Sequence, residues 1–458
     1  MKTTFAAILL PLLLVIASPR QLQAVSYEFI PVYKAGGLFP AISLGRVAMQ
    51  ITTHSDPPYD DFIESIITGD GGPVSTIITA FDPAPWGTFI SFNNRTSIKA
   101  GTVAFTGHDH DILRGGGGRS GIFTSNGGPL TTIAQTGDPA PIGTLYGVGD
   151  AFLGSAGVAF LATYNWAGDG SVNHAIFVGN GGPLTTIAKA GDPAPITTFD
   201  LLSYYDIDSD AVAFLGYYGT RDNGGNGIFT GNGGPLTTIA KGGDPAPIGT
   251  FQSFNSGRGL SIHDNTVAFV AQYGENPGTL SEGIFTGNGG SLTTIVQSGD
   301  PAPVGTFSDR FCWSFSGPAI NRDTVAFLAD YNVYRSGSFD IFTRGLFTSQ
   351  AGILSQVIAT GDPLFGSTIK DLYSFDLDEI GNLVFSYALA DGRGGTAIAH
   401  PIPEPGAAVL LFTVTACMAA MSRRRTLVGY VVGNVSVSNQ GTTTFLGYCS
   451  AALAMLAP

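Results

Sequence analysis

The sequence predicts an all-β fold, a seven-bladed β-propeller with four-stranded blades, and two observations predict it. First, the word Val-Ala-Phe recurs at Val103, Val158, Val212, Val267 and Val325, with weaker copies at Val47 and Leu383. The copies follow one another at intervals of about 55 residues, a period typical of propeller blades. Second, the two ends of the repeated region hold complementary parts of one unit.

Each unit reads as four strands in sequence order. The first is a short stretch before the Val-Ala-Phe word, such as 260–262, and a tight polar turn follows it. The second, Thr-Val-Ala-Phe-Leu-Ala, is apolar throughout and suits burial on both faces. The third is Gly-Ile-Phe-Thr-Gly, and the fourth, after an Asn-Gly-Gly-Pro turn, is Leu-Thr-Thr-Ile-Ala. We interpret the Gly-Asp-Pro-Ala-Pro segment that closes the unit as a connector, because proline cannot donate to a ladder.

The ends of the repeated region predict how the ring closes. Residues 27–37 align with a fourth strand, whereas residues 377–399 supply strands one to three and then stop. We therefore expect the N-terminal strand to complete the last blade, which removes the unpaired edges that an open array would expose. The rival fold is an open β-solenoid, which would not need a split unit.

Composition excludes two classes of protein. Hydrophobic residues make up 44% of the 458 residues, so the chain is not a disordered polar one. The formal net charge of −13 repels phosphate backbones, so we predict no nucleic-acid partner. The repeated region holds one cysteine, Cys312, so its stability must come from the core rather than from an internal disulfide.

The N-terminus has the pattern of a secretory signal. Lys2 precedes an apolar run from Phe5 to Ala17, and Leu22-Gln23-Ala24 is suited to precede a cleavage site. The run is too short for a comfortable membrane span. We therefore predict a signal peptide at 1–24 and the propeller at 25–400; the alternative is a buried N-terminal helix.

The segment 401–425 carries a second targeting pattern. Pro403, Glu404 and Pro405 precede an apolar run from residue 407 to 421, and the basic cluster Arg423, Arg424 and Arg425 follows. The segment resembles the PEP-CTERM sorting signal of exported bacterial proteins. The resemblance implies an exosortase-type processing enzyme as partner, transient membrane anchoring through a transmembrane helix, and delivery to the cell surface or the extracellular matrix.

The chain departs from that pattern after the arginines. Residues 426–458 form an extra tail, which we predict to be disordered or anomalous, since the family pattern usually stops near the basic cluster. The alternative for the whole segment is an ordinary C-terminal anchor with a chance Pro-Glu-Pro. The hairpin word Asn321-Arg322-Asp323-Thr324-Val325-Ala326-Phe327 resembles the NxxGxxAF-type tandem repeats of exported bacterial proteins, with Asp in place of Gly. That resemblance implies export and repetition and no particular activity.

No residue pattern predicts a catalytic or zinc site. The chain has no G-x-S-x-G elbow and no phosphate loop, and its six histidines, His108 and His110 among them, lack zinc spacing. Six aspartates recur before proline: Asp82, Asp138, Asp192, Asp244, Asp300 and Asp362. We interpret them as turn residues and predict no cofactor. A Ca²⁺ site is the alternative, because carboxylate oxygens suit that ion.

The loops between strands two and three vary most among the units, and variable loops on a constant scaffold often carry recognition. They hold aromatic residues beside Asn and Asp, a combination that suits sugar rings. The candidate ligand-binding residues are Tyr164, Trp166, Tyr217, Tyr218, Tyr273, Tyr331 and Tyr334. The alternative is that these tyrosines cap the blade cores.

Three functional hypotheses follow. The first is a non-catalytic, surface- or matrix-associated module that binds polysaccharide or a surface protein. The second is a polysaccharide lyase or glycosidase whose carboxylates lie in the propeller cavity. The third is a purely structural matrix protein.

Overall fold

The computed structural model describes residues 25–34, 38–54, 62–109, 118–165, 172–219, 224–254, 259–275, 280–308, 314–333 and 341–402. These residues form strands, turns and loops, and none of their segments is a helix long and apolar enough to cross a membrane. The predicted signal peptide, the sorting segment from Pro403 to Arg425 and the tail 426–458 lie outside the described residues.

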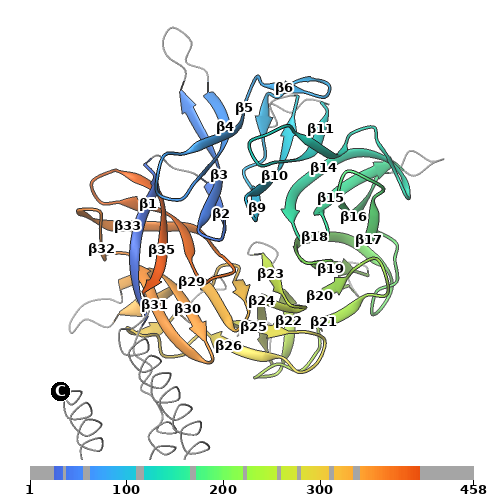
Figure 1. The fold of residues 1–458 in the computed structure, drawn as a ribbon. Coiled ribbons are helices and arrows are strands. Elements are labelled where there is room, and N and C mark those ends of the chain that lie inside the picture. Colours follow the sequence, from blue (N-terminus) through green and yellow to red (C-terminus); the bar gives the residue numbers. More distant parts are fainter. Residues whose placement is uncertain are drawn as a thin grey trace, which may run out of the picture. The chain divides into compact units, whose positions relative to one another are not determined.

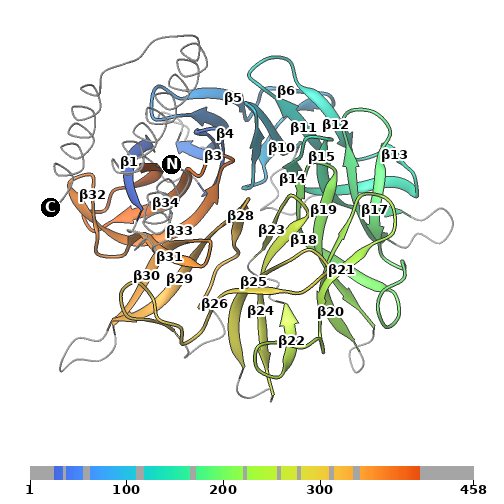
Figure 2. The same cartoon turned by 60° about the horizontal axis from the view of Figure 1, so that its bottom comes forward.

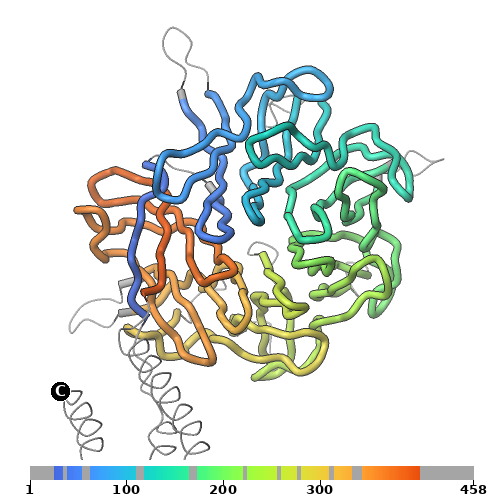
Figure 3. The backbone as a smooth tube through the Cα atoms, in the orientation of Figure 1, coloured from blue at the N-terminus to red at the C-terminus, as the bar shows by residue number. Residues whose placement is uncertain are grey.

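The described strands form seven blades around one axis and one additional two-stranded sheet, and the chain runs once around the ring (Figure 1, Figure 3). Blade 1 contains β2 (Leu38–Ser43), β3 (Arg46–His54), β4 (Phe62–Gly69) and β5 (Ser75–Thr79), and the hairpin β6 (Pro83–Ala84) and β7 (Gly87–Thr88) follows it. Blade 2 contains β8 (Ser91–Phe92), β9 (Ser97–Lys99), β10 (Thr102–His108), β11 (Ser120–Ser125) and β12 (Thr131–Gln135). Blade 3 contains β13 (Pro139–Ala140), β14 (Gly143–Leu153), β15 (Val158–Asn165), β16 (Val172–Gly179) and β17 (Thr185–Lys189). Blade 4 contains β18 (Phe199–Asp208), β19 (Ala211–Tyr218), β20 (Gly225–Gly231) and β21 (Thr237–Lys241).

The other three blades repeat this order. Blade 5 contains β22 (Thr250–Phe254), β23 (Leu260–His263), β24 (Thr266–Gly274), β25 (Ser281–Gly287) and β26 (Thr293–Gln297). Blade 6 contains β27 (Thr306–Phe307), β28 (Ala319–Asn321), β29 (Thr324–Val333), β30 (Ile341–Gln350) and β31 (Ile353–Ala359). Blade 7 contains β32 (Pro363–Leu364), β33 (Ser367–Leu377), β34 (Leu383–Leu389), β35 (Gly394–Ile402) and the N-terminal β1 (Ser26–Tyr33). The predicted seven-bladed propeller with four-stranded blades is confirmed.

The predicted split blade is also confirmed. Strand β1 pairs antiparallel with β35, with Phe29 opposite Ala399 and Tyr33 opposite Thr396. The two strands lie side by side in Figure 3, one from each end of the propeller sequence. The ring is therefore closed by backbone hydrogen bonds between segments at opposite ends of that sequence.

The Val-Ala-Phe word builds the core because its alternate side chains face opposite neighbouring blades. In blade 4, Val212 and Phe214 pack in one hydrophobic cluster with residues of blade 3, whereas Ala213 packs in another with residues of blade 5. All three side chains are buried. The core is thus a series of inter-blade layers, as the apolar run on strand two predicted.

A recurring aromatic group fills each of several layers. In blade 4, the ring centroid of Phe229 lies 5.0 Å from that of Phe199 and 5.7 Å from that of Phe214. The same arrangement recurs in blade 5, where the Phe285 ring lies 5.1 Å from Phe251. Such pairs contribute about 0.5–1.5 kcal/mol beyond the burial of their area.

The innermost strand differs from the prediction, because it starts well before the short stretch next to Val-Ala-Phe. It begins just after the Asp-Pro connector, and in blade 3 it forms the continuous strand β14. The connector itself is partly paired, with Pro245 bridged to Thr250 and Pro301 to Thr306. Proline can take part because its carbonyl still accepts a hydrogen bond. Strands β2, β9 and β23 lie near the axis, while β13 and β17 lie at the rim (Figure 1, Figure 2).

Candidate binding site at the centre of the ring

Every blade interrupts its innermost strand near the middle. In blades 2, 5 and 6 the strand is divided into two pieces, whereas in the other four blades it is continuous but carries a bulge. The bulges lie between Leu38 and Ala41, Val148 and Ala151, Ser203 and Tyr205, and Leu372 and Phe375. Bulges re-aim side chains and are common beside functional sites. The interruptions bring irregular backbone from different blades to the centre of the ring.

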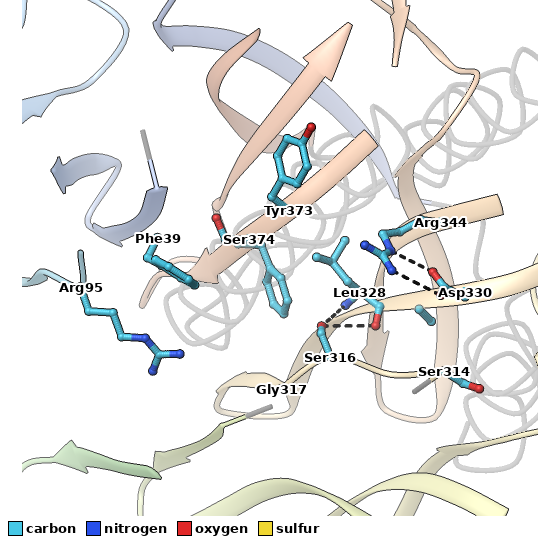
Figure 4. Close-up of a pocket in the computed structure, with 12 residues that line it drawn as sticks. Phe39, Arg95, Ser314, Ser316, Gly317, Leu328, Asp330, Arg344, Tyr373 and Ser374 are labelled. Atoms are coloured by element: carbon cyan, nitrogen blue, oxygen red, sulfur yellow. Dashed lines mark hydrogen bonds and ion pairs between the residues drawn. The ribbon is translucent and has the colours of Figure 1, made fainter. Parts of the chain in front are cut away.

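Two cavities that share residues lie at these interruptions. The first has a volume of about 220 Å³ and is lined by residues of all seven blades, including Arg95 of blade 2, Asp206 of blade 4 and Asp376 of blade 7. The second has a volume of about 310 Å³ and is lined by residues of blades 1, 2, 6 and 7 (Figure 4). Phe39, Arg95 and Ser374 line both cavities. We call their combined lining the central site.

Of the two arginines that line the central site, Arg95 has no bonded acidic partner among the described residues. Its guanidinium carbon lies 5.2 Å from the centroid of the Phe39 ring, a cation–π contact. Phe39 has a φ of 50°, which a non-glycine residue adopts only at a cost, and its side chain is 40% exposed. By contrast, Arg344 at the second cavity donates from Nε to Oδ1 of Asp330 at 2.8 Å.

Two hydroxyl groups of the central site have no hydrogen-bond partner among the described residues. They are Oγ1 of Thr96 in blade 2 and Oγ of Ser374 in blade 7, and both residues line the 220 Å³ cavity. The Thr96 side chain is deeply buried, at 6% exposure. A buried hydroxyl without a partner costs about 1–3 kcal/mol, and a ligand oxygen that reached either group would remove that cost.

Asp206 and Asp376 occupy equivalent positions of the inner strand, and each joins its blade to the next. Oδ2 of Asp206 accepts from the backbone N–H of Ile262, and Oδ2 of Asp376 accepts from that of Ile42, each at 3.0 Å. Each carboxylate also accepts the N–H of the following residue. Desolvation raises the pKa of Asp206 to about 6 and that of Asp376 to about 7, because both lie deep in the ring although their side chains are partly open to the cavity.

Serine performs the same joining role in two other blades. Ser97 accepts from the N–H of Leu153 at 2.9 Å, and Ser261 accepts from that of Ile320 at 3.3 Å. A neutral hydroxyl therefore suffices for the contact between blades. The two aspartates add titratable charge to the cavity beyond what this joining role requires.

Asp150 is close enough to Arg95 for their charges to interact, but its hydrogen bonds are made with other residues. Its Oδ1 accepts from Nδ2 of Asn93 at 2.9 Å, and its backbone carbonyl accepts from the Tyr205 hydroxyl at 2.6 Å. Burial raises the pKa of Asp150, and the positive charge of Arg95 partly opposes that rise. Asn93 in turn bonds through Oδ1 to Nε2 of His108 at 2.8 Å.

The five described residues among the aromatic residues predicted from the variable loops do not form an open face. The side chains of Tyr164, Tyr218, Tyr273 and Tyr331 are buried in the blade cores, so they cannot present a ring face to a ligand. Tyr217 is partly buried against the cluster between blades 4 and 5. Trp166 and Tyr334 lie outside the described residues.

The tyrosines are buried because strand two is longer than predicted and includes them. Strands β24 and β29 continue to Gly274 and Val333, so the tyrosines belong to strands and not to loops. The Tyr273 hydroxyl donates to Oε1 of Gln297 at 2.7 Å, and its ring lies 5.6 Å from that of Phe285. Burial raises the pKa of Tyr273 to about 12. The alternative interpretation, that these tyrosines cap the cores, describes what is observed.

The six aspartates before proline act as turn residues. In each case the carboxylate Oδ2 accepts the backbone N–H of the residue three positions earlier, as from Lys241 to Asp244 at 3.0 Å. The turn interpretation is thus confirmed, and each carboxylate serves its own blade. The described residues contain no group of three His, Cys, Asp or Glu side chains that could hold a metal ion.

The central site itself was missed by sequence reasoning. Arg95, Phe39 and Ser374 lie at irregular points of a strand, and no periodic pattern marks them. One signal was available: the inner-strand position before each turn varies among Ala41, Ser97, Phe152, Asp206, Ser261, Ala319 and Asp376, while the adjacent position is apolar in all units. A variable position beside a constant one indicates a surface facing water.

Comparison with solved structures finds distant similarity. The β-propeller domain of the Trilobed protease from Pyrococcus furiosus is 11% identical, with a TM-score of 0.47 over 82% of this chain and 98% of that chain. The acylaminoacyl peptidase of Pyrococcus horikoshii is 10% identical, with a TM-score of 0.47 over 83% and 53%. The polysaccharide lyase Uly1 is 12% identical, with a TM-score of 0.44 over 84% and 93%.

No curated protein sequence matches the chain. A family model does match it, at residues 40–254 and again at 100–409, and its description is a family of unknown function, DUF7453. The two matches overlap and together span residues 40–409, which is well over half of the sequence. The chain belongs to this DUF7453 family.

Proposed function

We propose that the protein is a non-catalytic binding module for polysaccharide and that its ligand occupies the central site. The observation that carries the proposal is the set of rings at the second cavity. Phe39 is 40% exposed and Tyr373 is 54% exposed, and Phe375 lines the same cavity. Aromatic rings beside hydroxyl and charged groups suit sugars, which offer C–H faces and hydroxyl groups.

The test is a binding measurement on the purified protein. Isothermal titration with a panel of neutral and acidic polysaccharides is expected to find at least one saturable ligand. Phe39→Ala and Tyr373→Ala should each weaken that ligand about 10-fold, which corresponds to about 1.4 kcal/mol. Tyr146→Ala is the matched control, because Tyr146 is 61% exposed and does not line the central site. Absence of a saturable ligand would favour a purely structural matrix protein, and equal binding by all three variants would place the ligand elsewhere.

A glycosidase or lyase is the second candidate. Asp206 and Asp376 line one cavity, and their pKa values of about 6 and 7 suit a general acid near neutral pH. The contact between blades that both share with serines gives them a structural role without catalysis. Release of reducing ends from a polysaccharide that is abolished by Asp206→Asn or Asp376→Asn, but retained by Ser97→Ala, would replace the binding proposal with an enzymatic one.

The cellular address of the protein is a separate proposal. We infer export, processing by an exosortase-type enzyme and delivery to the cell surface or matrix from the patterns at 1–24 and 401–425. Replacement of Pro403, Glu404 and Pro405 by alanine is expected to retain the protein in the membrane fraction of its host. Unchanged appearance at the surface would remove the role given to the motif.

A further inference from the structure

Arg95 stands apart from the other described basic side chains. Those either bind an acidic or hydroxyl partner, as Lys99 binds Asp208 at 3.1 Å and Arg46 binds Thr68 at 2.9 Å, or are exposed to solvent. Arg95 is partly buried, donates no hydrogen bond to a described residue and has no described carboxylate within 4 Å. A guanidinium has five N–H donors in a planar fork that matches a carboxylate. The central site therefore contains an unused carboxylate-binding group.

Two hydroxyl groups that line the same cavity as Arg95 suit the same kind of ligand. Thr96 follows Arg95 in the chain, and its buried Oγ1 has no partner among the described residues. Ser374, from blade 7, lines the same cavity with a hydroxyl in the same state. A hydroxyl can donate to a ligand oxygen, so a carboxylate at Arg95 would satisfy groups that are unpaired in the free protein.

The apolar part of the site suits a sugar ring attached to that carboxylate. Phe39 packs against the guanidinium of Arg95 (Figure 4). Phe375 lines both cavities. A planar ring beside a cation fits a ligand that carries an anionic group on an apolar face. We propose that the central site binds an acidic polysaccharide through the carboxylate of a uronic acid, with Arg95, Thr96 and Ser374 as donors to that carboxylate.

This inference rests on the proposed function and adds the ligand class to it. The carboxyl groups that face the cavity, Asp206 and Asp376, and nearby Asp150 act against an anion when they are charged. Their oxygens already accept backbone or amide N–H groups, so they do not compete for the donors of Arg95 by direct contact. The proposal therefore expects tighter binding at pH 5.5 than at pH 8, since protonation of Asp206 and Asp376 removes repulsion while a uronate stays ionised.

The test compares polymers that differ in the carboxylate alone. Isothermal titration uses polygalacturonate and its carboxyl-reduced galactan form, each with the wild-type protein, Arg95→Gln, Thr96→Val and Arg322→Gln. Arg322 is exposed and outside the central site, so it controls for the loss of one positive charge. Wild type and Arg322→Gln are expected to prefer polygalacturonate at least 10-fold, whereas Arg95→Gln should lose that preference while keeping its affinity for the reduced polymer. Thermal unfolding confirms that each variant is folded.

The outcomes separate this inference from the proposed function. Equal wild-type binding of the two polymers, with loss on Phe39→Ala, would overturn the carboxylate inference and leave the binding module intact. A preference for polygalacturonate that persists in Arg95→Gln would also overturn it. Failure of every polysaccharide to bind would overturn both. Rescue of the preference by Arg95→Lys would support a requirement for positive charge at this position.

Discussion

Single positions of the repeat show how one backbone requirement is met by different side chains. The N–H that follows the inner-strand position needs an acceptor from the preceding blade, since it has no partner within its own irregular strand. Aspartate supplies it in blades 4 and 7, and serine supplies it in blades 2 and 5. Aspartate and serine therefore make the same contact between blades, but only aspartate adds charge to the cavity.

Stability should depend on pH through the two aspartates. Their pKa values in the folded protein, about 6 and about 7, lie above the ordinary value near 3.9 of an unfolded chain. The folded state therefore binds more protons between pH 4 and 7, so stability is full at low pH and falls as pH rises through this window. The free energy of unfolding is expected to fall by about 1–3 kcal/mol from pH 5 to pH 8, because solvent in the central site screens the two carboxylates and reduces the effect.

The measurement is urea denaturation of wild type and Asp206→Asn/Asp376→Asn at pH 5 and pH 8. The double variant loses one acceptor at each site at every pH, so the difference between the two pH values is compared rather than the absolute stability. That difference should shrink in the double variant. An unchanged difference would mean that other groups cause the pH dependence.

The tyrosines illustrate what single residues reveal in sequence. Tyr273 lies six positions after Val267 and four after Phe269, so strand alternation predicts the same face for all three. All three pack in one cluster. The signal for burial was present, and the error lay in ending the predicted strand at Ala271, three residues before β24 ends.

At the scale of strands and turns, the apolar second strand and the turns around it were predictable because their patterns repeat. The inner strand was not, because its interruption is stabilised by the preceding blade. Oε2 of Glu64 accepts the N–H of Phe92 at 2.7 Å, and Oδ1 of Asn226 accepts that of Phe254 at 3.4 Å. These contacts join residues 28 positions apart in the chain, so no local pattern reveals them, and the central site that depends on them stays hidden too.

The Asn-Gly-Gly-Pro turn gives a matched pair of substitutions. Gly233 has a φ of 95°, and a Cβ there would lie 2.7 Å from Cγ2 of Thr185 in the preceding blade. Gly234 has no positive φ, and a Cβ there would lie 3.6 Å from Oδ1 of Asn232. Gly233→Ala should therefore destabilise the protein by about 1–3 kcal/mol, whereas Gly234→Ala should change its stability by less than about 1 kcal/mol.

Urea denaturation of the two variants checks this expectation. Both add one methyl group to the same turn, so composition and unfolded-state effects are nearly equal. A larger loss for Gly234→Ala, or equal losses, would contradict the assignment of the strained position.

At the scale of the whole molecule, the fold was predictable because six whole units and one split unit constrain the topology to a closed ring. The function was harder to predict from the sequence, since the proposed binding site lies where the inner strands are interrupted and no repeated pattern marks those positions. The ring is closed by the pairing of β1 with β35, which we call the seam, and a small hydrophobic cluster packs against these strands. That cluster includes Val32 of β1, which is 7% exposed, together with Ile42 and Ile398.

The seam should decide whether the ring stays closed. Val32→Asp places a charge in that cluster without a described partner, which is expected to cost about 3 kcal/mol or more and to loosen β1 from β35. The freed edge of β35 can pair with another chain, so self-association should increase with protein concentration. Ser26→Asp adds the same charge at an exposed position of β1 and is the control. Urea denaturation with light scattering after size exclusion measures both effects; if Val32→Asp matches Ser26→Asp in stability and mass, the N-terminal strand is not what holds the ring shut.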